Sequence, residues 1–80
     1  MAELVKIISC FGPTAVANNA LCADKTIEVY RKKNRKYVVK IFNGPCTKPY
    51  IRQTFSNSTE MELYVEGHSK SYPKVVKEEF

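Results

Sequence analysis

The chain lacks several features on which common protein functions depend. It has three glycines, Gly12, Gly44 and Gly67, and they stand too far apart to form a loop that cradles a phosphate. No apolar run of about 18 residues occurs, so we expect no membrane-spanning helix and no membrane partner. Internal repeats and linker-like segments are also missing. We therefore expect residues 1–80 to form one small domain with little stability to spare.

Cysteine and histidine are too sparse for a conventional metal site. Cys10, Cys22 and Cys46 form no Cys-x-x-Cys pair, and His68 is the only histidine. Zinc sites use closely spaced ligands of these types, so we expect no metal and no cofactor. Cys46 and His68 would act as a nucleophilic pair only if the fold brought them within hydrogen-bonding reach. The chain is therefore predicted to be non-enzymatic, with no catalytic residue and three reduced cysteines.

The N-terminal segment, MAELVKIISCF, argues against secretion. Glu3 stands where a signal peptide would carry positive charge, and a clean small-residue cleavage site is missing. We therefore expect the protein to be cytoplasmic.

Two alternating segments predict an antiparallel β-hairpin. TIEVY (26–30) and KYVVKIF (36–42) are rich in β-branched and aromatic residues, and Asn34 in the turn between them tolerates a positive φ. PYIRQTF (49–55) predicts a third strand that begins at Pro49, where a missing N–H does little harm.

The two ends of the chain leave alternatives open. ELVKIISCF (3–11) fits a helical stripe or a central strand, and its β-branched residues favour the strand. PTAVANNALCA (13–23) begins with proline and is rich in alanine, which favours a short helix, although Asn18-Asn19 also fits a turn between strands. The tail, SYPKVVKEEF (71–80), fits an edge strand or a loose end.

The segment SNSTEMELYVEGH (56–68) predicts a helix with both ends marked. Asn57 or Ser58 can cap the first turn, and Gly67 stands where a left-handed C-terminal residue is favoured. Its apolar contacts are expected to come from Met61, Leu63, Tyr64 and Val65. Together, these segments predict an α+β fold: an antiparallel sheet of three or four strands, with one or two helices packed on one face.

Strand parity assigns the side chains of the sheet to two faces. One face is apolar and suited to receive a helix; it holds Ile27, Val29, Tyr37, Val39, Ile41, Ile51 and Phe55. The opposite face is basic with two interleaved tyrosines; it holds Glu28, Tyr30, Lys36, Val38, Lys40, Tyr50 and Arg52. Gln53 fits this pattern poorly, because the register turns it inward.

Positive charge is concentrated in the middle of the chain. The net charge is +5, but residues 24–52 carry nine basic and two acidic side chains, and the remainder of the chain is acidic. Five of the six residues from Arg31 to Lys36 are basic. This asymmetry indicates an anionic partner.

The basic hairpin and the adjoining sheet face are predicted to bind RNA or another single-stranded nucleic acid, because cations neutralise phosphates and flat rings stack on bases. The residues predicted to hold phosphates are Arg31, Lys32, Lys33, Arg35, Lys36 and Lys40, with Lys48 and Arg52 extending the track. Tyr30 and Tyr50 are predicted to stack on bases. Two alternatives stay open: a solvated turn that keeps the hairpin from pairing with other edges, or a turn that docks on an acidic protein surface.

The order of hairpin, third strand and capped helix covers TIEVYRKKNRKYVVKIFNG and YIRQTFSNSTEMELYVEG. In length and plan the chain resembles small phage-encoded counter-defence proteins, including anti-CRISPR inhibitors. The resemblance implies a single-domain, non-enzymatic inhibitor that docks its basic hairpin on an acidic surface of a host defence complex. The resemblance is one of size and architecture, and it assigns no functional residue.

Overall fold

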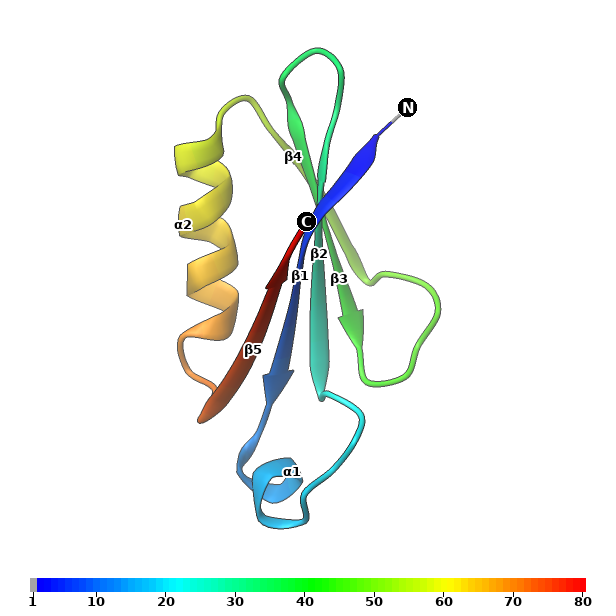
Figure 1. Ribbon diagram of the computed structural model, residues 1–80, viewed down its shortest axis with the longest axis vertical. Helices are drawn as coiled ribbons and strands as arrows, with labels where there is room; N and C mark the ends of the chain where they lie inside the picture. The colour runs from blue at the N-terminus through cyan, green and yellow to red at the C-terminus, as the bar shows by residue number, and fades with distance from the viewer. Residues whose placement is uncertain (1) are drawn as a thin grey trace.

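The alternating segments of the chain form one antiparallel sheet in the computed structural model, which describes residues 2–80 (Figure 1). The elements in chain order are β1 (Glu3–Phe11), α1 (Pro13–Ala17), β2 (Lys25–Arg31), β3 (Tyr37–Asn43), β4 (Ile51–Phe55), α2 (Ser58–Ser69) and β5 (Lys74–Glu79). The strand order is β4-β3-β2-β1-β5, and each neighbouring pair is antiparallel. The predicted α+β class is confirmed. The sheet has five strands because both ends of the chain join the hairpin and β4.

The ambiguous N-terminal segment is a strand followed by a short helix. Strand β1 pairs with β2 on one side and with β5 on the other, which makes it an interior strand. Pro13 begins α1, where its missing N–H is tolerated. The helix is shorter than the range 13–23, because Asn19 adopts a positive φ of 52° and turns the chain after Ala17. Helix α1 lies beyond one end of the sheet (Figure 1).

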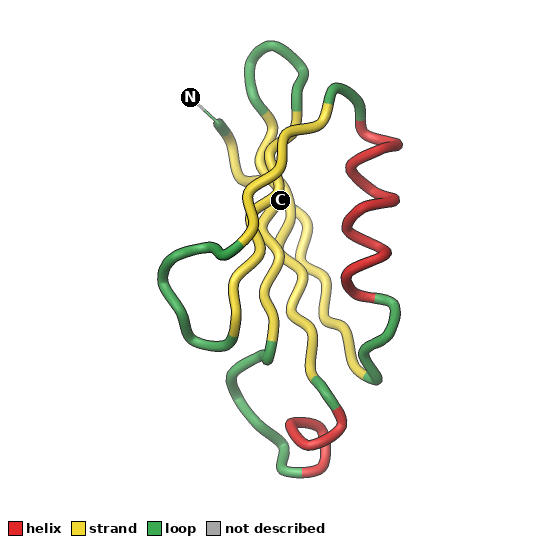
Figure 2. Tube along the Cα trace, turned by 180° about the vertical axis from the view of Figure 1, so that it is seen from behind, coloured by secondary structure: helices red, strands yellow, loops and turns green. Residues whose placement is uncertain are grey.

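The core lies between α2 and one face of the sheet (Figure 2). The predicted apolar face is confirmed: Ile27, Val29, Val39 and Ile41 are buried, and Tyr37, Ile51 and Phe55 pack beside them. Strand β1 adds Ile8 and Cys10, and α2 contributes Met61 and Val65. Burial raises the pKa of the Cys10 thiol, so this cysteine stays protonated and acts as a small apolar group. Gln53 is exposed despite its inward parity, since β4 is an edge strand.

Helix α2 runs past its predicted end. Gly67 lies inside the helix, which continues to Ser69. Ser69 is buried because it follows Val65 by four residues and so lies on the stripe that faces the sheet. Leu63, predicted to be an apolar contact, is 65% exposed because it stands two residues from both Met61 and Val65 and points away from that stripe. Among residues 2–80, neither helix is long and apolar enough to cross a membrane.

Asn57 rather than Ser58 caps the start of α2. The Asn57 Oδ1 accepts a hydrogen bond from the Glu60 N–H at 2.9 Å, which satisfies one of the unpaired donors of the first turn. We expect Asn57→Ala to lower the free energy of unfolding by about 1 kcal/mol. Ser58→Ala is expected to change it by less than about 0.5 kcal/mol, because Ser58 is the first residue within the helix. Urea unfolding of the two variants tests this difference, and equal destabilisation would contradict the assignment of the cap.

Candidate nucleic-acid interface

The basic turn, which we define as residues 31–36, is held by its backbone and by one asparagine. The Lys32 N–H donates to the Lys36 carbonyl at 2.8 Å, and the Arg35 N–H donates to the Lys32 carbonyl at 3.1 Å. The Asn34 Oδ1 accepts from the Lys36 N–H at 3.2 Å. The left-handed position is Arg35, with φ of 66°, and not Asn34 as predicted, because Asn34 closes the turn with its side chain. The lysine side chains therefore stay available to solvent and ligands.

Four cations of the basic turn dominate its potential. Arg31 forms an ion pair with Glu3 of β1, with 3.5 Å between Nη2 and Oε2, which offsets part of its charge. Lys33, Arg35 and Lys36 are exposed, and Lys32 is half-buried. Figure 1 shows that the turn projects from the end of the sheet opposite α1. A protruding, positively charged element of this kind attracts anionic partners.

The open face of the sheet, which we define as the face away from α2, carries a second group of predicted residues. Glu28, Lys40 and Arg52 lie directly opposite one another on β2, β3 and β4. They form one row of side chains, in which neighbouring Cβ atoms are about 5 Å apart. Arg52 is exposed, whereas Glu28 and Lys40 are half-buried. The row therefore places two cations beside one carboxylate in the middle of the open face.

Tyr30 contacts both of the half-buried charged side chains in this row, Glu28 and Lys40. Its hydroxyl donates a hydrogen bond to Glu28 Oε1 at 2.7 Å, and Lys40 Nζ lies 4.7 Å from the centroid of its ring. The hydrogen bond to Glu28 raises the pKa of Tyr30, with further contributions from burial and from the charge of Glu28. Tyr30 therefore remains a neutral donor at physiological pH, and one face of its ring is occupied by an amine.

A pocket lies between the open face and the β3–β4 loop. This open-face pocket has a volume of about 520 Å³, within the range of small-ligand sites. Its lining comprises Thr26, Glu28, Tyr30, Lys40 and Phe42 from the sheet and Gly44, Pro45, Cys46, Thr47 and Pro49 from the loop. Figure 2 shows this loop and α2 on opposite sides of the sheet. Neither Phe42 nor the pocket was predicted from the sequence, although the parity that placed Lys40 on this face also places Phe42 there.

The ten predicted residues fall into three groups along β3. The basic turn holds Arg31, Lys32, Lys33, Arg35 and Lys36; the open face holds Tyr30, Lys40 and Arg52; the β3–β4 loop holds Lys48 and Tyr50. Tyr50 is 50% exposed, and its N–H donates to the Ile41 carbonyl at 2.9 Å. The turn and the loop adjoin opposite ends of β3, so about 20 Å separates them at about 3.4 Å per strand residue. Lys40 lies between them on β3.

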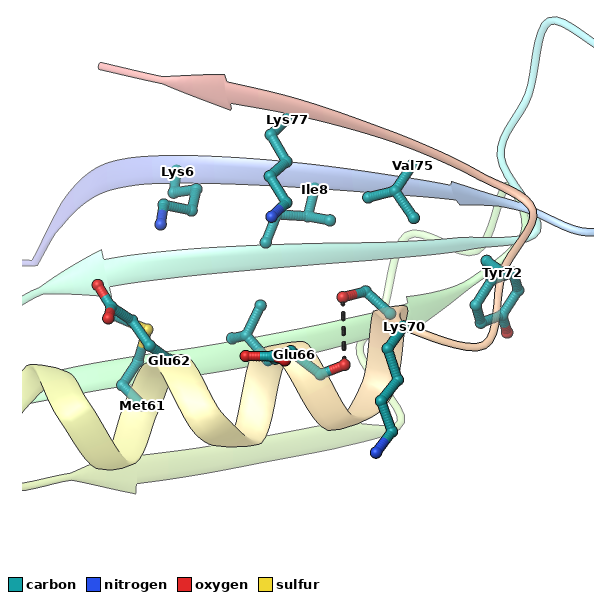
Figure 3. Close-up of a pocket in the computed structure, with 11 residues that line it drawn as sticks. Lys6, Ile8, Met61, Glu62, Glu66, Lys70, Tyr72, Val75 and Lys77 are labelled. Atoms are coloured by element: carbon teal, nitrogen blue, oxygen red, sulfur yellow. Dashed lines mark hydrogen bonds between the residues drawn. The ribbon is translucent and has the colours of Figure 1, made fainter.

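The opposite side of the sheet has a hollow of mixed charge. This helix-face groove, of about 410 Å³, lies between α2 and strands β1 and β5 (Figure 3). Its lining includes Lys6 and Lys77 from the sheet and Glu62 and Glu66 from α2. Lys6 also forms an ion pair with Glu79, with 3.4 Å between Nζ and Oε1. Because cations of the sheet face carboxylates of α2 across this groove, it offers a polyanion no attraction comparable with that of the basic turn.

Cys46 and His68 lie on opposite faces of the sheet and are not placed as a nucleophilic pair. Cys46 lines the open-face pocket, whereas His68 belongs to α2, with its ring centroid 4.7 Å from that of Tyr64. Burial lowers the pKa of His68, and the positive charge of Lys25 lowers it further. Lys25 Nζ also donates to the His68 carbonyl at 3.3 Å, so the histidine belongs to the packing of α2.

The comparisons with known proteins do not assign the chain to a family. Neither a protein-family model, nor a curated protein, nor a solved structure matches the chain. The resemblance to small phage-encoded inhibitors therefore stays a prediction, and the function is inferred from the geometry of the charged surface.

Proposed function

We propose that the protein is a non-catalytic binding protein for RNA or another single-stranded nucleic acid. The observation that carries this proposal is that the basic turn connects β2 and β3, two central strands of a sheet face that α2 leaves uncovered. Cations beside accessible rings are the combination that a single strand requires, because its phosphates and its bases are bound at the same time.

Phosphate binding is assigned mainly to the basic turn. Lys32, Lys33, Arg35 and Lys36 supply its charge, while Arg31 shares its charge with Glu3. Lys40 and Arg52 on the open face, and Lys48 in the β3–β4 loop, continue the positive track towards the far end of β3.

Base stacking is assigned to Tyr50 and Phe42. The paired residues Ile41 and Ile51 end the β3–β4 ladder, and Tyr50 directly precedes it, with its N–H bound to the Ile41 carbonyl. Tyr50 is half-exposed and Phe42 lines the open-face pocket, so each ring has a surface that a base can contact. Tyr30 was predicted to stack as well, but we assign it the role of holding Lys40 and Glu28.

Fluorescence anisotropy with a labelled single-stranded RNA of about 12 nucleotides tests the proposal, since one small fold covers about 4–16 nucleotides of a single strand. We expect micromolar or tighter binding at low salt, and about 10-fold weaker binding of a duplex of the same sequence, because its bases are already stacked. Single-stranded DNA of the same sequence measures the preference for RNA. Absence of binding by the folded protein would contradict the proposal, and the basic turn would then be assigned to docking on an acidic protein surface.

A further inference from the structure

We propose that the open-face pocket is a nucleobase subsite that selects guanine. This inference rests on the proposed function, because the pocket lies on the surface assigned to the single strand. It adds a base preference that a track of phosphate contacts does not provide, since phosphate contacts carry no sequence information.

The pocket presents a carboxylate and an amine side by side. Glu28 and Lys40 lie directly opposite each other on β2 and β3, and both line the pocket. Tyr30 orients the two groups, since its hydroxyl binds Glu28 Oε1 and its ring lies beneath Lys40 Nζ. A carboxylate repels phosphate, so its position in the middle of a basic surface favours a ligand group that donates hydrogen bonds.

The walls of the pocket suit a flat aromatic ring. Phe42 contributes an aromatic side chain from β3, and Pro45 and Pro49 contribute two rings of fixed backbone geometry from the loop. Because proline fixes its own φ, these two walls have little backbone freedom to lose when a ligand binds. Its volume of about 520 Å³ accommodates one base with its sugar.

Guanine matches this arrangement better than the other bases. Its Watson–Crick edge carries two adjacent donors, N1–H and the N2 amino group, beside the O6 acceptor. The donors complement the Glu28 carboxylate and O6 complements the Lys40 amine. Uracil has one N–H between two carbonyl oxygens and would place an acceptor against the carboxylate. Adenine and cytosine each offer a single amino group and no adjacent ring N–H.

The test compares heptanucleotides of uridine that carry guanosine, inosine, adenosine, cytidine or uridine at the central position. We expect the guanosine oligonucleotide to bind about 10-fold more tightly than the uridine one, as for other bidentate base contacts. Inosine lacks the N2 amino group and is expected to fall between them. Glu28→Gln should abolish the preference, because its amide presents a donor towards the donors of guanine.

Glu62→Gln is the matched control, since Glu62 is exposed on α2 and its loss changes the net charge by the same amount. This variant should keep the guanine preference. Equal affinity for all five oligonucleotides, or a preference that survives in Glu28→Gln, would overturn the base subsite and leave the proposed function standing. If the folded protein bound none of the oligonucleotides, the proposed function would fail and the subsite with it.

Cys46 provides a second readout of the pocket. In a Cys22→Ser background, Cys46 is the exposed cysteine, because Cys10 is buried. At equal saturation, the guanosine oligonucleotide is expected to slow alkylation of Cys46 by iodoacetamide more than the uridine one does. Identical alkylation rates with both oligonucleotides would place the selected base elsewhere and overturn the inference.

Discussion

Changing Lys32, Lys33 and Lys36 together to serine is expected to weaken binding to single-stranded RNA about 100-fold at about 50 mM salt. Each lysine that neutralises a phosphate releases condensed counterions, and this release is the main source of affinity at low salt. The turn should keep its shape in this variant, because its hydrogen bonds are made by the backbone and by the Asn34 side chain. The loss would therefore report on charge and not on folding.

A matched variant separates local charge from total charge. Lys70, Lys74 and Lys77 lie outside the proposed interface. Changing them to serine removes three positive charges, as many as the turn variant loses. We expect this control to weaken binding less than about 5-fold, since these lysines contribute only at long range, where salt screens them. Equal losses in the two triple variants would show that the protein attracts RNA by its net charge alone.

Ile27→Ala is expected to lower the free energy of unfolding by about 3 kcal/mol. Ile27 is 0% exposed and lies opposite Ile8 of β1 and Ile41 of β3, in the centre of the sheet. Its truncation removes apolar contacts to both neighbours and leaves a cavity beneath α2. Since domains of this size unfold with only about 5–10 kcal/mol, the variant should lose a large share of its stability.

Urea denaturation followed by circular dichroism measures this effect as a lower midpoint. Leu63→Ala is the control, because Leu63 is exposed on α2, and we expect it to change the free energy of unfolding by less than about 0.5 kcal/mol. A mild effect of Ile27→Ala, similar to that of the control, would contradict the placement of the core between α2 and β2.

The strands and their faces were predictable because they depend on local periodicity. The alternation from Ile27 to Val29 and from Tyr37 to Ile41 identified the face that α2 covers. Other features depend on tertiary contacts that periodicity does not encode. The continuation of α2 past Gly67 is one example, because it follows from the burial of Ser69 against the sheet.

The candidate site was only partly predictable, for two physical reasons. The basic turn was recognisable because its charges are contiguous in sequence. The open-face pocket was not, because the β3–β4 loop has no periodic pattern and its position over Phe42 depends on the folded chain. The pairing of Arg31 with Glu3 was equally hidden, since it requires β1 to lie beside β2.

The dependence of RNA affinity on salt shows whether the basic turn and the open face bind phosphates. The measurement is the slope of log affinity against log salt concentration, for the wild type and for the two triple-lysine variants. If the turn and open face bind about five phosphates, the wild-type slope should be roughly −3 to −4, and about 2 units shallower in the variant of Lys32, Lys33 and Lys36. A slope near zero, or a slope that the turn variant leaves unchanged, would contradict the assignment of this surface to nucleic acid.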